Sequence, residues 1–175
     1  MNEVLGVFDL GIPIIHFLFV LLVIFVIFCA CYIKQGQIYK GQLLILLFVI
    51  YMYVLAGSTI FYRDSWYLSL NWVRRYEMIP FRSYYEAITR NQYILMLQCL
   101  LNVILFIPFG LLLNAVLKPK SMVGIVIFAF LLSFVIEILQ ALTHRGLCEM
   151  DDIIHNTVGA WLGCLLFRKI TLLWK

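Results

Sequence analysis

Hydrogen-bonding and ionisable side chains lie inside, or at the start of, three of the most apolar stretches of this 175-residue chain. Asn102 lies in the first stretch, Glu137 and Gln140 in the second, and Asp152 and Asn156 near the start of the third. A charge at the centre of a membrane costs about 2.5 to 3.5 kcal/mol, so each such group is expected to have a partner or a function. These residues are therefore candidates for a binding or catalytic site.

The chemistry open to these groups is proton transfer or hydrogen bonding. Glu137 and Asp152 are the candidate general bases, provided that burial tunes their pKa. The alternatives are structural: the amides could join neighbouring helices, and Glu137 could form an ion pair with Arg145. The sequence leaves both readings open.

An acidic cluster, Glu149, Asp151 and Asp152, precedes the last apolar stretch. Carboxylates at the start of a helix stabilise its positive end, which explains one of the three. The others could bind a divalent cation, but a fuller set of oxygen ligands is missing from the sequence pattern. We predict no metal site and no cofactor, and the sequence does not decide whether this cluster binds a cation.

The overall composition identifies the solvent of the fold. Hydrophobic residues make up 65% of the chain and charged residues only 13%, and the mean hydropathy is +1.02. A soluble domain is about half apolar and about a quarter charged, so a water-soluble globule and a disordered chain are both excluded. We predict a single all-α membrane domain covering residues 1–175.

Membrane spans follow from the length of the apolar runs. A helix rises about 1.5 Å per residue, so about 20 apolar residues cross a hydrocarbon core of roughly 30 Å. Five segments fit or nearly fit, and they are 14–33, 41–62, 93–117, 121–142 and 153–167. The sequence therefore predicts about five transmembrane helices.

The orientation of these helices follows from the charges between them. Basic residues beside the spans stay in the cytoplasm. With the N-terminus outside, every lysine lies on the cytoplasmic side and every acidic residue outside the spans lies on the outer side. We predict a multi-pass protein with its N-terminus outside and its C-terminus in the cytoplasm.

This topology brings the polar residues to a common depth. Asn102 lies about 13 Å from the outer end of its span, and Glu137 lies about 8 Å from the outer end of the next. Asp152 and Asn156 begin the last span at that same face. The sequence therefore predicts a polar site in the outer leaflet.

The outer segment 63–92 is rich in aromatic residues, which favour the headgroup level of a membrane. Ser83 and Glu86 have the spacing of a capping box that opens a short helix at 84–90. Arg82, or Arg74 together with Arg75, either extends to the headgroups or binds a phosphate or carboxylate of a ligand. In the last span, Gly159 and Gly163 predict close packing against a neighbouring helix.

Several runs of residues, taken together, resemble the VanZ-like family of bacterial membrane proteins. The runs are Ile79-Pro-Phe81, Asn102-Val-Ile-Leu-Phe-Ile-Pro-Phe-Gly110, Glu137-Ile-Leu-Gln140, and Arg145 followed by Glu149-Met-Asp151-Asp152-Ile-Ile-His-Asn156-Thr-Val-Gly159. The resemblance covers about 58–167. Departures include Glu149 where an aspartate is expected and His155 where an aliphatic residue is usual, which leaves the ligand open.

The family's name comes from a protein associated with resistance to teicoplanin, a lipid-tailed glycopeptide antibiotic. The resemblance thus implies a bacterial envelope protein that lowers susceptibility to such antibiotics. Its expected partners are membrane lipids, a lipid-linked wall precursor or the lipoglycopeptide itself, with no nucleic acid. The candidate ligand-binding residues are Arg82, Asn102, Glu137, Gln140, Arg145, Asp151, Asp152 and Asn156. The alternative function is a membrane enzyme acting on a lipid-linked phosphate or headgroup.

Overall fold

A computed structural model describes residues 37–61, 76–119, 121–143 and 146–173. The predicted first span, 14–33, lies outside these residues, as do Arg74, Arg75, Arg145 and much of the aromatic segment 63–92. Contacts divide the chain into two compact units, 1–63 and 64–175. Each unit is described by itself.

The first unit contains helix α2, Gln37–Ala56, which continues into a π-helical turn, η1, at Gly57–Phe61. Together they cover residues 41–61 of the predicted span 41–62. At the junction the hydroxyls of Ser58 and Thr59 both donate to the backbone oxygen of Leu55, at 3.0 and 2.8 Å. Such side-chain bonds compete with the regular helical pattern, and this competition accompanies the change of helix type.

The second unit is built from three long helices, α4 (Ile94–Leu117), α5 (Val123–Leu142) and α6 (Met150–Leu173). The predicted bounds 93–117 and 121–142 agree with α4 and α5 to within two residues. The last helix is longer at both ends than the predicted 153–167, because the acidic residues at its start and the segment from Arg168 to Leu173 are also helical.

Three segments of the described helices are long and apolar enough to cross a membrane: Gly41–Thr59, Ile94–Leu117 and Val123–Leu142. This finding supports a membrane protein. Helix α6 does not meet the same criterion, since Asp151, Asp152, Arg168 and Lys169 lower its hydropathy. Its 24 residues nevertheless extend about 36 Å.

Helix α6 packs against both α4 and α5, and its contact with α4 depends on missing side chains. A Cβ atom added to Gly110 would lie 1.9 Å from the backbone oxygen of Ala160. One added to Gly159 or Gly163 would lie 2.2 or 2.0 Å from a backbone oxygen of α4. The predicted close packing at the two glycines of α6 is therefore confirmed, and α4 contributes a third glycine to it.

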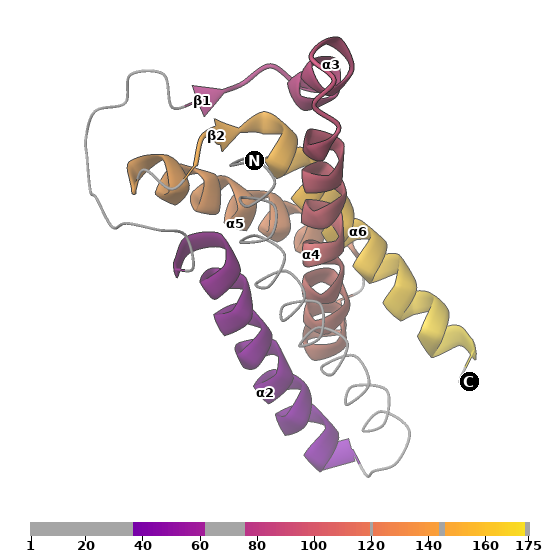
Figure 1. The fold of residues 1–175 in the computed structure, drawn as a ribbon. Helices are drawn as coiled ribbons and strands as arrows, with labels where there is room; N and C mark the ends of the chain where they lie inside the picture. Colours follow the sequence, from indigo (N-terminus) through magenta and orange to yellow (C-terminus); the bar gives the residue numbers. More distant parts are fainter. Residues whose placement is uncertain (1–36, 62–75, 120, 144–145, 174–175) are drawn as a thin grey trace. The chain divides into compact units, whose positions relative to one another are not determined.

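One end of this unit carries small additional elements (Figure 1). Strand β1 (Tyr76–Glu77) pairs in parallel with strand β2 (Cys148–Glu149), and helix α3 (Arg82–Thr89) follows β1. The strand pair joins the segment before α4 to the start of α6. The helical class is confirmed, while this two-residue pair was not predicted.

The predicted capping box at the start of α3 is wrong. The N-cap is Phe81, which has the left-handed backbone angle φ 63°, and no side chain of the helix caps it. Glu86, the expected return partner, instead pairs with Arg82 and Arg90. A carboxylate from another part of the chain takes the role that Ser83 was expected to play.

Candidate functional site

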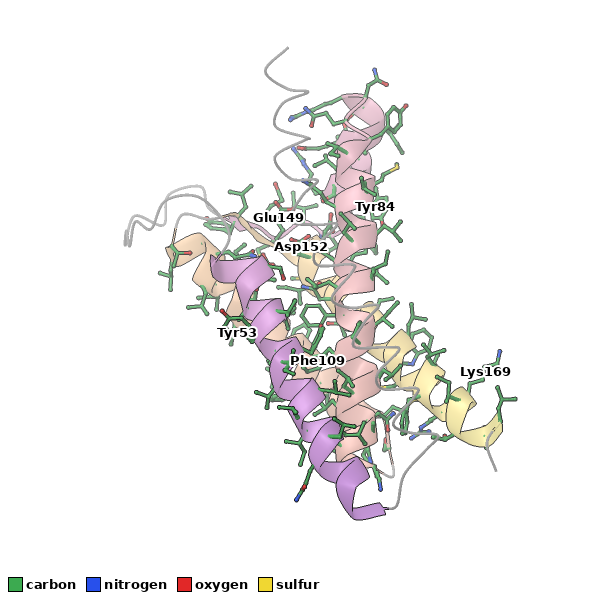
Figure 2. The ribbon with its side chains drawn as sticks, turned by 60° about the horizontal axis from the view of Figure 1, so that its bottom comes forward. Tyr53, Tyr84, Phe109, Glu149, Asp152 and Lys169 are labelled. Atoms are coloured by element: carbon green, nitrogen blue, oxygen red, sulfur yellow. The ribbon has the colours of Figure 1, made fainter. Side chains whose placement is uncertain are left out.

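The polar residues gather at the end of the second unit where α4 begins, α5 ends and α6 begins. In Figure 2, Tyr84, Glu149 and Asp152 lie toward this end and Lys169 lies toward the opposite end of α6. Contacts join α3 to α4, α5 to β2 and β1 to β2. The start of α4, the end of α5 and the start of α6 thus lie at one end of the unit, while the common depth in the outer leaflet stays a prediction.

Asp151 connects the start of α6 to the start of α3. One carboxylate oxygen accepts the backbone N–H of Phe81, and the other accepts the backbone N–H of Ser83 at 2.8 Å. The carboxylate therefore caps α3 from outside that helix. Hydrogen bonds to a charged group contribute about 1.5 to 3 kcal/mol each, which offsets the roughly 1 to 2 kcal/mol that a left-handed Phe81 costs.

Glu137 connects α5 to β2. Its side chain is only 1% exposed, and its Oε2 accepts the backbone N–H of Glu149 at 3.0 Å. A buried carboxylate needs such donors because isolated charge is poorly solvated there. Glu137 thus holds the strand that leads into α6, in the same way that Asp151 holds the turn that leads into α3.

Asn156 connects α6 to α5. Its Nδ2 donates to the hydroxyl of Ser133 at 2.8 Å, and both residues are buried. The Oδ1 atom of the same amide is buried and accepts no hydrogen bond from the residues that the structure describes. A buried unpaired acceptor costs about 1 to 3 kcal/mol, so this oxygen is an available position for a donor group.

A tyrosine and a histidine cover the contact between α3 and α6. His155 is buried, and its Nδ1 bonds the backbone oxygen of Asp151. Since a carbonyl oxygen only accepts, Nδ1 carries the proton, and Nε2 accepts the hydroxyl of Tyr84 at 2.7 Å. Burial raises the pKa of the Tyr84 phenol, as do the nearby Cys99 and Asp151, so the hydroxyl remains a donor.

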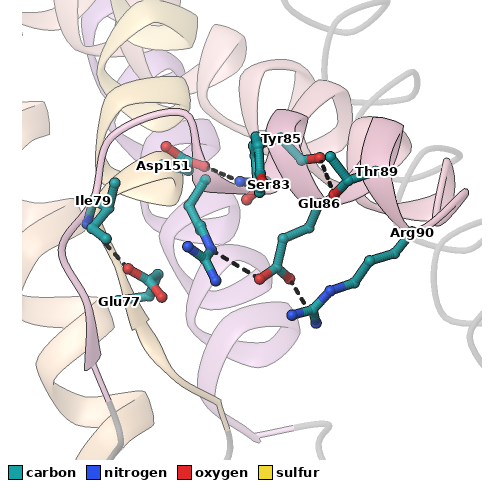
Figure 3. A network of polar contacts seen from close by, with 9 residues as sticks. Glu77, Ile79, Ser83, Tyr85, Glu86, Thr89, Arg90 and Asp151 are labelled. Atoms are coloured by element: carbon teal, nitrogen blue, oxygen red, sulfur yellow. Dashed lines mark hydrogen bonds and ion pairs between the residues drawn. The ribbon is translucent and has the colours of Figure 1, made fainter.

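Arg82 faces Glu86 rather than the buried groups. Its Nε lies 2.9 Å from Oε1 of Glu86, while Arg90 lies 3.6 Å from the other carboxylate oxygen. The bond to Glu86 raises the pKa of the Arg82 guanidinium. Figure 3 shows Glu86 and Arg90 together, with Asp151 reaching Ser83. Arg82 therefore belongs to a charged row on α3 that is half-buried at Arg82 and Glu86 and exposed at Arg90.

The remaining candidates divide by burial. Gln140 is buried on α5 beside Glu137, and Asp152 is half-buried. Asn102 is half-buried on α4, where no hydrogen bond of its side chain is seen within the described part of the chain. Arg145 lies outside the described residues. The structure thus joins α5 and α6 through polar side chains but does not tie Asn102 to them.

Helix α4 contributes a different residue to this end. Cys99 is buried, and it helps to raise the pKa of the Tyr84 phenol, whereas Gln98 beside it on α4 is exposed. Tyr84, Ser133 and Cys99 were not predicted as part of the site. Ser133 lies four residues before Glu137, on the same face of α5, and this helical spacing is a signal that could have identified it. No spacing identifies Tyr84, because α3 is placed only by tertiary contacts.

The acidic cluster does not form a metal site among the residues that the structure describes. Asp151 is engaged with α3, and the Glu149 backbone is engaged with Glu137. Cys148 lies in the same strand, where burial raises the pKa of its thiol and the carboxylates of Glu137 and Glu149 raise it further. The site is therefore rich in acceptor oxygens.

Comparisons with known proteins identify the family of the chain. The family model VanZ/LLP1 matches residues 43–174. The chain belongs to the VanZ/LLP1 family. It is also 44% identical over 66 residues to the protein VanZ of Enterococcus faecium. That match covers 38% of this chain and 41% of the relative, so the chain spans about two fifths of the relative's length.

No solved structure matches this VanZ-like chain.

Proposed function

We propose that this VanZ-like chain is a bacterial cell-membrane protein that lowers susceptibility to lipid-tailed glycopeptide antibiotics of the teicoplanin type. Its polar site would engage a lipid or a lipid-linked wall precursor in the outer leaflet. The proposal includes five spanning helices, an outer N-terminus, a cytoplasmic C-terminus and an aromatic-rich segment at the outer surface. Family membership supports the type of protein, and the buried groups of α5 and α6 support the site.

The observation that carries the site is the buried amide of Asn156. Its Nδ2 donates to Ser133, so the amide presents its Oδ1 as an acceptor to which no residue in the described part of the chain donates. Glu137 and Gln140 lie buried on the facing helix. Amide and carboxylate oxygens bind groups that donate hydrogen bonds, such as hydroxyl and amide N–H groups. Both occur on glycosylated and peptide-bearing wall precursors, which fits the proposed class of ligand.

The ligand would enter the site from the membrane. The entrance would lie where Asp152, half-buried in the first turn of α6, meets the end of α5. A ligand with a lipid tail is concentrated at this level, because its tail stays in the leaflet while its polar part reaches the helix ends. Arg82, Asn102, Arg145 and Asp151 complete the proposed site, with Asp151 acting through its hold on α3.

The first test is expression of the wild type and of Glu137→Gln in a sensitive host, followed by growth in teicoplanin and in vancomycin. We expect the variant to lose its protection against teicoplanin, because the amide replaces one acceptor oxygen of the buried carboxyl group with an N–H donor. Vancomycin, which has no lipid tail, serves as the comparison drug. Equal membrane amounts of the two proteins must be confirmed by immunoblot.

A matched control is Glu77→Gln. Glu77 lies at the same end of the unit, and its carboxylate accepts the Ile79 N–H in an exposed hydrogen bond of 3.3 Å. Its protection should equal that of the wild type. Asn156→Leu, which removes the free acceptor at similar volume, should also lose protection. Full teicoplanin protection by both Glu137→Gln and Asn156→Leu at normal abundance would contradict the proposed site.

The same cells distinguish binding from catalysis. Glu137 and Asp152 remain the candidate bases for an enzyme acting on a lipid-linked phosphate or headgroup. Lipid precursors extracted from cells with the wild type and with Glu137→Gln should have the same chemical composition if the protein only binds them. A precursor that is modified in the wild type and unmodified in the variant would favour the enzyme.

A further inference from the structure

The segment that leads into α4 exposes a row of large apolar side chains. Ile79, Phe81, Tyr85 and Ile88 are 57%, 59%, 62% and 63% exposed. Phe81, Tyr85 and Ile88 are spaced by four and then three residues, so they share one face of α3. Ile79, Phe81, Tyr85 and Ile88 together form the apolar edge.

The apolar edge is held in place from the opposite side. The N–H groups of Phe81 and Ser83 bond to Asp151 of α6, and the part-buried Tyr84–His155 hydrogen bond holds the next turn. Phe81 keeps a left-handed backbone while its ring remains exposed. A strained backbone persists only where the surrounding structure holds it. Because the Phe81 ring is nevertheless 59% exposed, we infer that it binds a surface outside the unit.

A charged row runs beside the apolar edge. Arg82, Glu86 and Arg90 follow one another at intervals of four residues and form two ion pairs. The row carries one more positive than negative charge. Apolar residues on one face and guanidinium groups on the next form the pattern of a helix that lies in a membrane surface, with its cations near lipid phosphates.

The apolar edge continues into the lipid-facing surface of a candidate span. Three residues separate the end of α3 at Thr89 from Tyr93, so the chain keeps the two helices within about 14 Å. Tyr93, Ile94, Leu97 and Leu100 in the first turns of α4 are exposed as well. Exposed apolar residues thus lie on both sides of the short polar connection 89–92, on α3 before it and at the start of the candidate span after it.

We propose that the apolar edge inserts into the headgroup and acyl boundary of a phospholipid leaflet. The occupant of this surface is a lipid surface, because only a short connection separates the edge from the exposed apolar start of the span, and because arginines lie beside the edge. The inference rests on the membrane placement in the proposed function and is independent of the ligand of the polar site. Asp151 is a positioning residue for this contact, because it holds Phe81 and α3 in the inserting orientation.

The test is spin labelling of the full chain in vesicles of phosphatidylethanolamine and phosphatidylglycerol. Ile88→Cys carries the label on the apolar edge, and Arg90→Cys carries it on the charged row as the matched control. The wild type, labelled in parallel, measures the background from natural cysteines, of which Cys99, Cys148 and Cys164 are buried. Collisions with oxygen, which is concentrated in lipid, are compared with collisions with a water-soluble nickel chelate.

We expect the label at position 88 to show a several-fold higher ratio of oxygen to nickel collisions than the label at position 90. A nickel-accessible label at position 88 would overturn the proposal in favour of water. A label at position 88 that neither reagent reaches would overturn it in favour of another protein surface, such as a second copy. Tyr85→Cys repeats the measurement one turn away if the first variant fails to fold. Antibiotic protection is not measured here, so the two proposals fail separately.

Discussion

Two regions of helix α6 are held in different ways, its middle by close backbone packing and its first turns by hydrogen bonds. Its middle crosses α4 where Gly110, Gly159 and Gly163 lack side chains, so that backbone lies directly against backbone. Its first turns are held by named polar bonds, from Asp151 to α3 and from Asn156 to Ser133. The crossing leaves no room for added atoms. At the polar end, by contrast, we expect single hydrogen bonds to be dispensable for the packing of the helices. A binding site, whose residues differ with the ligand, is therefore expected at the polar start of α6 and not at the glycine crossing.

The largest effect should come from filling the crossing. Gly110→Ala places a Cβ atom 1.9 Å from the Ala160 oxygen, and this neighbour is backbone that cannot rotate away. We expect a loss of about 3 kcal/mol in the free energy of unfolding, measured by titration with denaturing detergent. Gly124→Ala on α5 is the matched control, because nothing lies within 4 Å of the added atom. Equal stability of the two variants would show that the helices do not cross this closely.

A smaller and more local effect should follow from Asp151→Ala. The variant loses two charge-assisted bonds, worth about 2 to 3 kcal/mol together after the backbone groups find water. We expect faster hydrogen exchange at the Phe81 and Ser83 amides, with the exchange of α4 and α5 unchanged. If exchange accelerates across the whole second unit, the polar end is not the separable region that the comparison describes.

The smallest effect concerns the pH dependence of stability at Cys148. Burial and two carboxylates raise its pKa in the folded protein above that of the unfolded chain. Below the unfolded pKa both states keep the proton, so stability is unaffected. At higher pH the unfolded chain loses its proton first, and the free energy of unfolding falls.

The unfolding free energy should therefore decrease more for the wild type than for Cys148→Ser between about pH 8 and about pH 10. The difference between the two chains removes the contribution of the other cysteines. An identical decrease in both would mean that strand β2 opens and leaves the thiol in water.

The long helices could be predicted because their signals are local. The apolar runs at 93–117 and 121–142 need only length to satisfy their backbone groups in lipid, and α4 and α5 have nearly these bounds. The glycines of α6 could also be predicted, since a spacing of four residues places them on one face. Burial of Glu137, Gln140 and Asn156 agrees with the expectation that polar residues in spans point inward.

The partners of these residues could not be predicted, because each partner lies far away in the sequence or on an element without a local signal. Ser83 and Glu86 have the right types for a capping box, yet Asp151, separated from Ser83 by 68 positions, provides both acceptors. A capping motif specifies only that N–H groups need an acceptor. Which oxygen arrives depends on the pairing of β1 with β2 and on the position of α6.

The sequence by itself determined that this is a membrane protein, where its long helices lie and which family it belongs to, since these depend on composition and on short-range pattern. The tertiary structure alone decided that Asp151 caps α3, that Glu137 holds Glu149, and that Ser133 leaves one oxygen of Asn156 free. The physical reason is that hydrogen bonds form over about 3 Å between atoms that only the packed helices bring together.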